Sequence, residues 1–134
     1  MLSHIYINNI VLVDELSIDC HTELSIITGE TGAGKSIWVD AIAFAMGQRA
    51  QTSLIRQGQT QCQVILTFDI THRPVVQQWL QEHDLGNEDH ECLLQRHLNQ
   101  DGRSKALING RPCPLHLVRE LSQQLLLIHS QHQH

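Results

Sequence analysis

The feature that most constrains the fold is the run Gly29-Glu30-Thr31-Gly32-Ala33-Gly34-Lys35-Ser36, which has the form G-x-x-x-x-G-K-[ST]. A short apolar stretch, Glu23 to Thr28, precedes this motif, and apolar residues at helical spacing follow it. The pattern predicts a strand that runs into a glycine-rich loop, which then opens a helix. This arrangement is typical of phosphate-binding loops. The alternative is a glycine-rich turn in which a Lys-Ser pair occurs by chance.

The chemistry of phosphate binding explains each residue type in the motif. Gly29, Gly32 and Gly34 allow backbone conformations that other residues avoid. The backbone amides from about Gly32 to Ser36 can then converge on a phosphate at a helix N-terminus. Lys35 would supply positive charge to the β- and γ-phosphates, and the Ser36 hydroxyl would bind Mg²⁺. We therefore predict that residues 29–36 bind ATP with Mg²⁺ and that Lys35 also serves catalysis.

The remaining pattern predicts alternating strands and helices. The first thirty residues have β character, and the helix that follows the motif is expected to stop at Gly47. Later in the chain we expect a strand over Cys62–Ile70, a helix from Pro74, a hairpin around Asp101-Gly102 and a last helix opened by Pro112 and Pro114. The run Leu125–His129 could extend that helix or form a short buried strand, and we favour the strand.

Composition places the chain among ordinary globular proteins. Its 134 residues fit one domain, with 41% hydrophobic and 17% charged residues. The net charge of -5 argues against a nucleic-acid surface that works by bulk electrostatics. It leaves room for a local basic patch, or for a DNA site in another part of a larger protein.

The cysteines and the N-terminus indicate a cytoplasmic location. Cys20, Cys62, Cys92 and Cys113 form no CxxC pair, so we expect reduced thiols and no zinc site. The N-terminus lacks the features of a signal peptide. No stretch approaches the roughly 18 apolar residues of a membrane span, so no membrane partner is expected.

Residues that could support hydrolysis are harder to find. The nearest candidate for a Walker B strand is Val64 to Asp69, but Thr67 interrupts it and no Glu follows Asp69. We expect Asp69 to be the end of an ordinary, half-exposed strand. Arg49 and Arg56 could reach a γ-phosphate or could be solvated loop residues, and both interpretations stay open.

The last residues offer one further candidate. His129, His132 and His134 could form a metal site, but no carboxylate or cysteine lies nearby in the sequence, so this interpretation is not favoured. Gln131 is more informative, because a glutamine at this point could sit against Mg²⁺ and the attacking water.

Several separated motifs together resemble a known family. "TGETGAGKS", "GQRA", "LIRQG", "HECLLQR", "DGRSKALING" and "IHSQH" occur in the order found in the N-terminal portion of the RecN family, bacterial DNA-repair ATPases related to SMC proteins. The resemblance covers essentially all of the chain. It implies an α/β P-loop NTPase fold, with residues 1–134 as the first lobe of an ABC-type ATPase head and a β-rich subdomain beside the nucleotide.

The resemblance also implies what this lobe would need from elsewhere. Gln131 would match the Q-loop glutamine, with a catalytic role and a place at Mg²⁺, although Ser130 stands where the family usually has glycine. The signature motif, Walker B and the catalytic Glu would lie in the second half of the head, beyond a coiled coil. The chain is therefore expected to be a fragment that binds ATP and hydrolyses it poorly. The implied partners are that missing half, a second head in a homodimer, and DNA through the full-length protein at the nucleoid.

Two other functions are compatible with the glycine motif. One is a small P-loop kinase, which would need a second substrate pocket and an arginine-bearing lid that the sequence does not offer. The other is a non-catalytic nucleotide-binding or interaction module.

Overall fold

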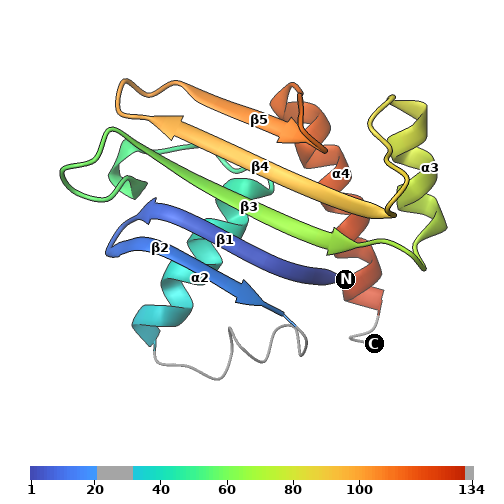
Figure 1. The fold of residues 1–134 in the computed structure, drawn as a ribbon, viewed down its shortest axis with the longest axis horizontal. Coiled ribbons are helices and arrows are strands. Elements are labelled where there is room, and N and C mark those ends of the chain that lie inside the picture. The colour runs from blue at the N-terminus through green and yellow to red at the C-terminus, as the bar shows by residue number, and fades with distance from the viewer. Residues whose placement is uncertain (21–31, 132–134) are drawn as a thin grey trace.

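The computed structural model describes residues 1–20 and 32–131, with the backbone alone for 32–36 and 126–131. These residues form a six-stranded sheet with helices packed on one face (Figure 1). The elements are β1 Leu2–Ile10, β2 Val13–Asp19, α2 Gly32–Ala45, a 3-10 helix Thr52–Leu54, β3 Gln61–Asp69, α3 Pro74–Glu82, β4 Glu91–Asn99, β5 Ser104–Ile108, β6 Arg111–Pro112 and α4 Leu115–Gln131. The strand order is β2-β1-β3-β4-β5-β6, and each neighbouring pair is antiparallel.

The alternation of residues along the strands explains why helices cover only one face. On β3 and β4 every second side chain is buried and the residues between them are partly exposed. Such alternation is typical of an antiparallel sheet with one face on the core. The buried positions of these two strands are Cys62, Val64, Leu66, Phe68, Cys92, Leu94, Arg96 and Leu98. Arg96 is the one charged residue among them.

Helix α2 lies across the middle of the sheet. It packs on β1, β3 and β4, while α4 packs on β5 and α3. Its buried side chains are those of Trp38, Ala41, Phe44 and Ala45. Trp38, the largest of them, is 7% exposed and belongs to the hydrophobic core.

The predicted stop of α2 at Gly47 is confirmed. The Gly47 N–H donates to the carbonyl of Phe44 (3.2 Å), and the Gln48 N–H donates to the carbonyl of Ala43 (3.1 Å). These two bonds form a Schellman motif, in which the residue after the helix adopts a left-handed conformation. Gly47 has φ +108°, a conformation that glycine adopts without steric cost.

Other predicted elements agree with the structure or need correction. The strand near Cys62–Ile70, the helix from Pro74 and the hairpin around Asp101-Gly102 are confirmed. The predicted strand at Leu125–His129 is wrong, since α4 continues through Gln131. No glycine or proline interrupts this run, and leucine and glutamine are good helix formers. Pro112 belongs to β6, so only Pro114 directly precedes the last helix. The predicted strand Glu23–Thr28 lies outside the described residues.

The expectation of reduced thiols is also confirmed. Cys20, Cys62, Cys92 and Cys113 are all free, and the first three are buried. Burial raises the pKa of Cys62 to about 11 and that of Cys92 to about 12, so both thiols stay protonated near neutral pH. None of the helices within residues 1–20 and 32–131 has the length and apolarity of a membrane span.

Candidate functional site

The N-terminus of α2 is where the structure places the second half of the glycine motif. Gly32 to Ser36 open this 14-residue helix, whereas Gly29, Glu30 and Thr31 lie outside the described residues. The first amides of a helix have no acceptor within it, and its dipole favours an anion there. No acidic residue lies in the first turn of α2 to neutralise this end. The start of this helix therefore fits a phosphate group.

Gln131 is the last residue of the other helix that matters here, α4. In Figure 1, α2 begins at the lower left of the view and α4 ends at the lower right. The side chains of Lys35, Ser36 and Gln131 are outside the described part of the structure. Their roles at ATP and Mg²⁺ stay predictions.

The loop arginines proposed for a γ-phosphate lie beyond the end of α2. Arg56 has its guanidinium 3.9 Å from the Asp14 carboxylate, and both side chains are exposed. An exposed pair at this distance contributes little to stability. Arg49 is exposed and lies at the edge of hollows beside α2. The role of either arginine at a nucleotide remains a prediction.

Asp69 behaves as the end of an ordinary strand. It is the exposed last residue of β3, and its carboxylate accepts bonds from the backbone N–H (3.0 Å) and the hydroxyl (2.6 Å) of Thr71. These bonds stabilise the charged form and lower the pKa of the carboxyl group. The arrangement is a local turn that follows the strand, in agreement with the expectation from the sequence.

The opposite end of α2 contains a feature that sequence reasoning missed. Arg96 of β4 is only 1% exposed, and its Nη1 donates to the carbonyls of Phe44 (2.7 Å) and Gln48 (2.8 Å). Its guanidinium also lies over the Phe44 ring, 4.6 Å from the centroid, and its Nη2 donates to the Ser104 hydroxyl (3.2 Å). An arginine at an otherwise apolar position of a strand is the sequence signal that could have identified it.

The electrostatics of Arg96 are unusual for a buried charge. Burial lowers the pKa of its guanidinium, and the charge of Arg119 lowers it further. Among the described residues no carboxylate forms an ion pair with Arg96, and its Nε has no hydrogen-bond partner. Buried charges are normally paired. Here the negative end of the α2 dipole takes the place of a counter-ion.

A second arginine contacts the same helix end from α4. The Arg119 Nε donates to the carbonyl of Gly47 (2.8 Å). Beside this contact a groove of about 660 Å³ runs between α2 and α4. Ser122, in the wall of this groove, is buried and its hydroxyl has no hydrogen-bond partner among the described residues. The apolar lining of the groove comes from Val39, Ile42, Ala43 and Met46.

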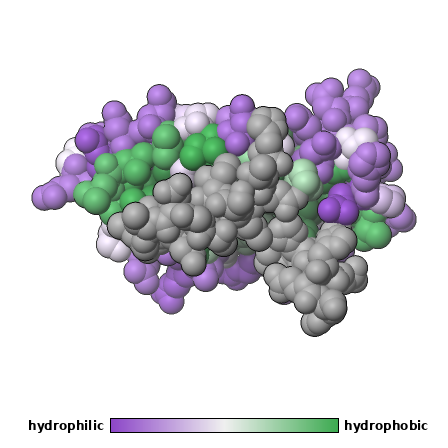
Figure 2. All heavy atoms as spheres, turned by 90° about the horizontal axis from the view of Figure 1, so that it is seen from below, coloured by the Kyte–Doolittle hydropathy of each residue, from purple (hydrophilic) through white to green (hydrophobic). Residues whose placement is uncertain are grey.

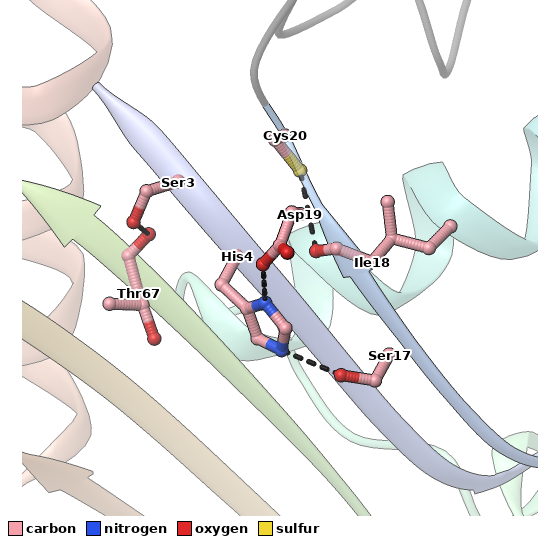
Figure 3. A network of polar contacts seen from close by, with 7 residues as sticks. All are labelled: Ser3, His4, Ser17, Ile18, Asp19, Cys20 and Thr67. Atoms are coloured by element: carbon pink, nitrogen blue, oxygen red, sulfur yellow. Dashed lines mark hydrogen bonds and ion pairs between the residues drawn. The ribbon is translucent and has the colours of Figure 1, made fainter.

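Ser17, His4 and Asp19 form a row of hydrogen-bonded side chains on the sheet face opposite the helices (Figure 3). The order serine, histidine, aspartate is that of a hydrolytic triad. His4 Nδ1 lies 2.6 Å from an Asp19 carboxylate oxygen, and its Nε2 lies 2.7 Å from the Ser17 hydroxyl. A hydrolytic triad needs a buried carboxylate to orient the histidine. The Asp19 side chain is 68% exposed, so we interpret these three side chains as a surface contact between β2 and β1. Among the described residues no group of His, Cys, Asp or Glu is arranged to hold a metal ion.

Some apolar side chains of the β1–β2 turn, β2 and α2 are exposed. Leu12 in the β1–β2 turn is 82% exposed, Leu16 of β2 is 38% exposed and Val39 of α2 is 47% exposed. Seen from below, the molecule shows apolar areas within a polar rim (Figure 2). Exposed apolar surface of this kind often marks a contact with another domain or protein.

Comparison with known proteins identifies the family. The pattern of the RecF/RecN/SMC N terminal domain matches residues 1–130. The chain belongs to this family. The glycine motif at the start of α2, and the sheet that helices cover on one face, are thus features of a RecF/RecN/SMC N-terminal domain.

Several curated relatives of this chain are named DNA repair protein RecN. The chain is 42% identical to RecN of Vibrio cholerae over 134 residues, which is 100% of this chain and 24% of the relative. It is 42% identical to RecN of Haemophilus influenzae, over 98% of this chain and 24% of the relative. It is 31% identical to RecN of Bacillus subtilis, over 98% of this chain and 23% of the relative. The chain therefore spans about a quarter of the length of these relatives.

Solved structures show the same fold. A chain from "Structural biochemistry of ATP-driven dimerization and DNA stimulated activation of SMC ATPases" has a TM-score of 0.71 at 19% identity, covering 93% of this chain and 79% of that one. The SMC head domain from Thermotoga maritima has a TM-score of 0.60 at 19% identity, covering 89% of this chain and 41% of that one. The predicted fold, the first lobe of an SMC-type ATPase head, is confirmed. Family and fold together imply a nucleotide-binding domain.

Proposed function

We propose that this chain is the ATP-binding N-terminal part of a RecN-like protein that acts in DNA double-strand break repair and recombination. The observation that carries the proposal is the position of the glycine motif. Within a domain that matches the RecF/RecN/SMC family over residues 1–130, the motif opens a long helix whose first turn lacks acidic residues. The RecN relatives are named as DNA repair proteins, which supplies the biological process.

Each part of the motif binds a different group of the nucleotide. The backbone amides of residues 29–36 surround the β-phosphate at the positive end of the α2 dipole. Lys35 neutralises charge on the β- and γ-phosphates, and Ser36 binds Mg²⁺. Gln131, at the end of α4, completes the Mg²⁺ site and orients the attacking water.

The chain acts with partners that supply the rest of the catalytic groups. It spans about a quarter of the length of its relatives, and apolar side chains such as Leu12 in the β1–β2 turn and Val39 of α2 are exposed. Both observations support a missing second half of the head that packs against this lobe. The similar SMC ATPases are described as dimerising under ATP and as stimulated by DNA. We extend this to a homodimer of heads that engage under ATP and hold or bridge DNA at the nucleoid.

The proposal is tested by comparing the two lysines of the sequence, Lys35 and Lys105. Lys105 is exposed on β5, so Lys105→Ala is a matched control. Titration of the chain with ATP and Mg²⁺ in a calorimeter should show binding by the parent and by Lys105→Ala, and no detectable binding by Lys35→Ala. Equal binding by both variants would contradict the site.

The same preparations test whether the groups needed for ATP hydrolysis lie in the missing half of the head. The 134-residue chain should release phosphate from ATP at a rate close to that of the uncatalysed reaction. Robust hydrolysis that is lost in Lys35→Ala would show that a catalytic carboxylate lies within this chain.

A further inference from the structure

The C-terminal end of α2 is held by cations that come from two other elements. Arg96 reaches it from β4 and Arg119 reaches it from α4. The last turn of α2 contains no basic residue of its own. The charges that complement the negative end of this helix thus depend on the tertiary structure.

The two contacts of Arg96 fix the helix end in more than one direction. One nitrogen, Nη1, donates to Phe44, inside the helix, and to Gln48, beyond the turn that follows it. The Phe44 ring packs under the same guanidinium. Carbonyls on both sides of the Schellman turn are therefore tied to one point on β4. A rotation of α2 about its axis, or a slide along it, would break at least one of these bonds.

Arg119 and Gly47 are matched in shape as well as in hydrogen bonding. A Cβ atom on residue 47 would lie 2.6 Å from the Arg119 Cγ, so α4 lies directly on the backbone of the turn. No side chain separates the two helices at this point. The contact fixes where α4 begins relative to where α2 ends.

These two helices carry the separate parts of the proposed site. Lys35 and Ser36 stand at the start of α2, and Gln131 stands at the end of α4. The contact between Arg119 and Gly47 joins the opposite ends of the same helices. We propose that Arg96 and Arg119 are positioning residues for nucleotide binding, which set the place of α2 on the sheet and its angle to α4. This inference rests on the proposed function of the phosphate loop.

Arg119 is the better residue for a test, because it is an exposed residue whereas Arg96 is only 1% exposed. Arg111 is the matched control. Its Nη1 donates to the backbone carbonyl of Asp84, at the end of α3, with a similar distance of 2.7 Å. Arg111→Ala and Arg119→Ala therefore each remove one bond between an arginine and a helix-end carbonyl. Only the second should alter the proposed site.

The experiment measures the dissociation constant for ATP, with Mg²⁺ and with EDTA, at a temperature where all variants are folded by circular dichroism. With Mg²⁺, Arg119→Ala should raise the constant roughly 5- to 10-fold and Arg111→Ala should leave it unchanged. Without Mg²⁺ the loss in Arg119→Ala should be smaller, because Ser36 of α2 and Gln131 of α4 are both proposed to bind the metal. Arg119→Lys should recover part of the affinity. If Arg119 only stabilised the fold, Arg119→Ala would lower the melting temperature but would leave the dissociation constant for ATP equal to that of the parent, with and without Mg²⁺.

The outcomes separate this inference from the proposed function. Binding that depends on Lys35 but is equal in the parent, Arg119→Ala and Arg111→Ala would overturn the positioning role alone. Absence of ATP binding by the parent chain would overturn the proposed function and, with it, the positioning role.

Discussion

Helices α2 and α3 end in the same backbone motif but are stabilised by different side chains. In both, the N–H groups of the two residues after the terminal turn donate back to carbonyls within the helix, as in a Schellman motif. In α2 the bonds run from Gly47 to Phe44 and from Gln48 to Ala43; in α3 they run from Asp84 to Gln81 and from Leu85 to Leu80. Each left-handed residue also gives its carbonyl to an arginine, Arg119 in α2 and Arg111 in α3.

The residue that follows the turn makes the difference. In α3 it is Leu85, which is 5% exposed and belongs to the same hydrophobic core as Leu80. An apolar contact of this kind is the usual companion of the motif. In α2 it is Gln48, which is exposed, and its carbonyl is bound by the buried Arg96. One helix end relies on apolar packing, whereas the other relies on hydrogen bonds from a buried cation.

The largest effect is expected from Arg96→Met. This change keeps much of the side-chain volume but removes the guanidinium bonds to the carbonyls of Phe44 and Gln48. The Phe44 carbonyl keeps its bond from the Gly47 N–H. Hydrogen bonds to charged groups contribute about 1.5–3 kcal/mol each, and the guanidinium's desolvation cost offsets part of this. We expect the free energy of unfolding to fall by about 2–3 kcal/mol, measured by urea denaturation.

Arg103→Met is the control for this measurement. The Arg103 side chain is 86% exposed and lies 3.7 Å from Asp101 in the hairpin turn, so its loss should cost no more than about 0.5 kcal/mol. If Arg96→Met were as stable as this control, the desolvation cost would cancel the hydrogen bonds. The ends of α2 and α3 would then differ in their contacts but not in how much those contacts stabilise the fold.

The next effect is expected from Gly47→Ala. The φ of +108° is strained for alanine, and the new Cβ would lie 2.6 Å from the Arg119 Cγ. Together these should lower the free energy of unfolding by about 2 kcal/mol. Gly58→Ala measures the cost of backbone strain alone. Gly58 has φ +88°, and a Cβ added there would meet no neighbouring group within 4 Å.

A double-mutant cycle isolates the contact between the helices. In an Arg119→Ala background the Cγ atom is absent, so Gly47→Ala should cost about 0.5–1 kcal/mol less than in the parent. Additive effects would mean that α4 does not press on the turn of α2.

Local patterns are sufficient to predict much of this fold. The alternation on β3, the proline before α3 and the glycine after α2 are determined by residues within a few positions of each other. The motif at the start of α2 is also evident, since its residues are contiguous. The run Leu125–His129 is predicted wrongly because a short apolar segment fits a buried strand and a buried helix equally well.

The arginine contacts cannot be predicted in the same way. Arg96 and Phe44 are 52 positions apart in the sequence, and Arg119 and Gly47 are 72 apart. The bond between His4 and Asp19 likewise depends on the register of β1 against β2, which sequence alternation alone does not specify. Such contacts depend on which elements pack together, and a single sequence does not contain that information in readable form.

A smaller effect, of opposite sign, is expected at the end of α3. Asp84 has φ +57° and is exposed, so Asp84→Gly removes backbone strain without removing a buried side chain. The gain should be about 0.5 kcal/mol, because aspartate tolerates this conformation better than most residues and glycine is more flexible when unfolded. A loss of stability in thermal or urea unfolding would mean that the Asp84 side chain itself supports the turn.

The smallest effect is expected from Arg111→Ala. Its bond to the Asp84 carbonyl is exposed, so water can replace the guanidinium, and the change in the free energy of unfolding should stay within about 0.5 kcal/mol. The packing of Leu85 beside Leu80 is untouched by this substitution, and we expect it to keep the end of α3 in place. Hydrogen exchange of the α3 amides checks this directly: their protection should match that of the parent chain. Faster exchange, with a stability loss comparable to that of Arg96→Met, would show that both helix ends depend on a cation and that apolar packing does not distinguish them.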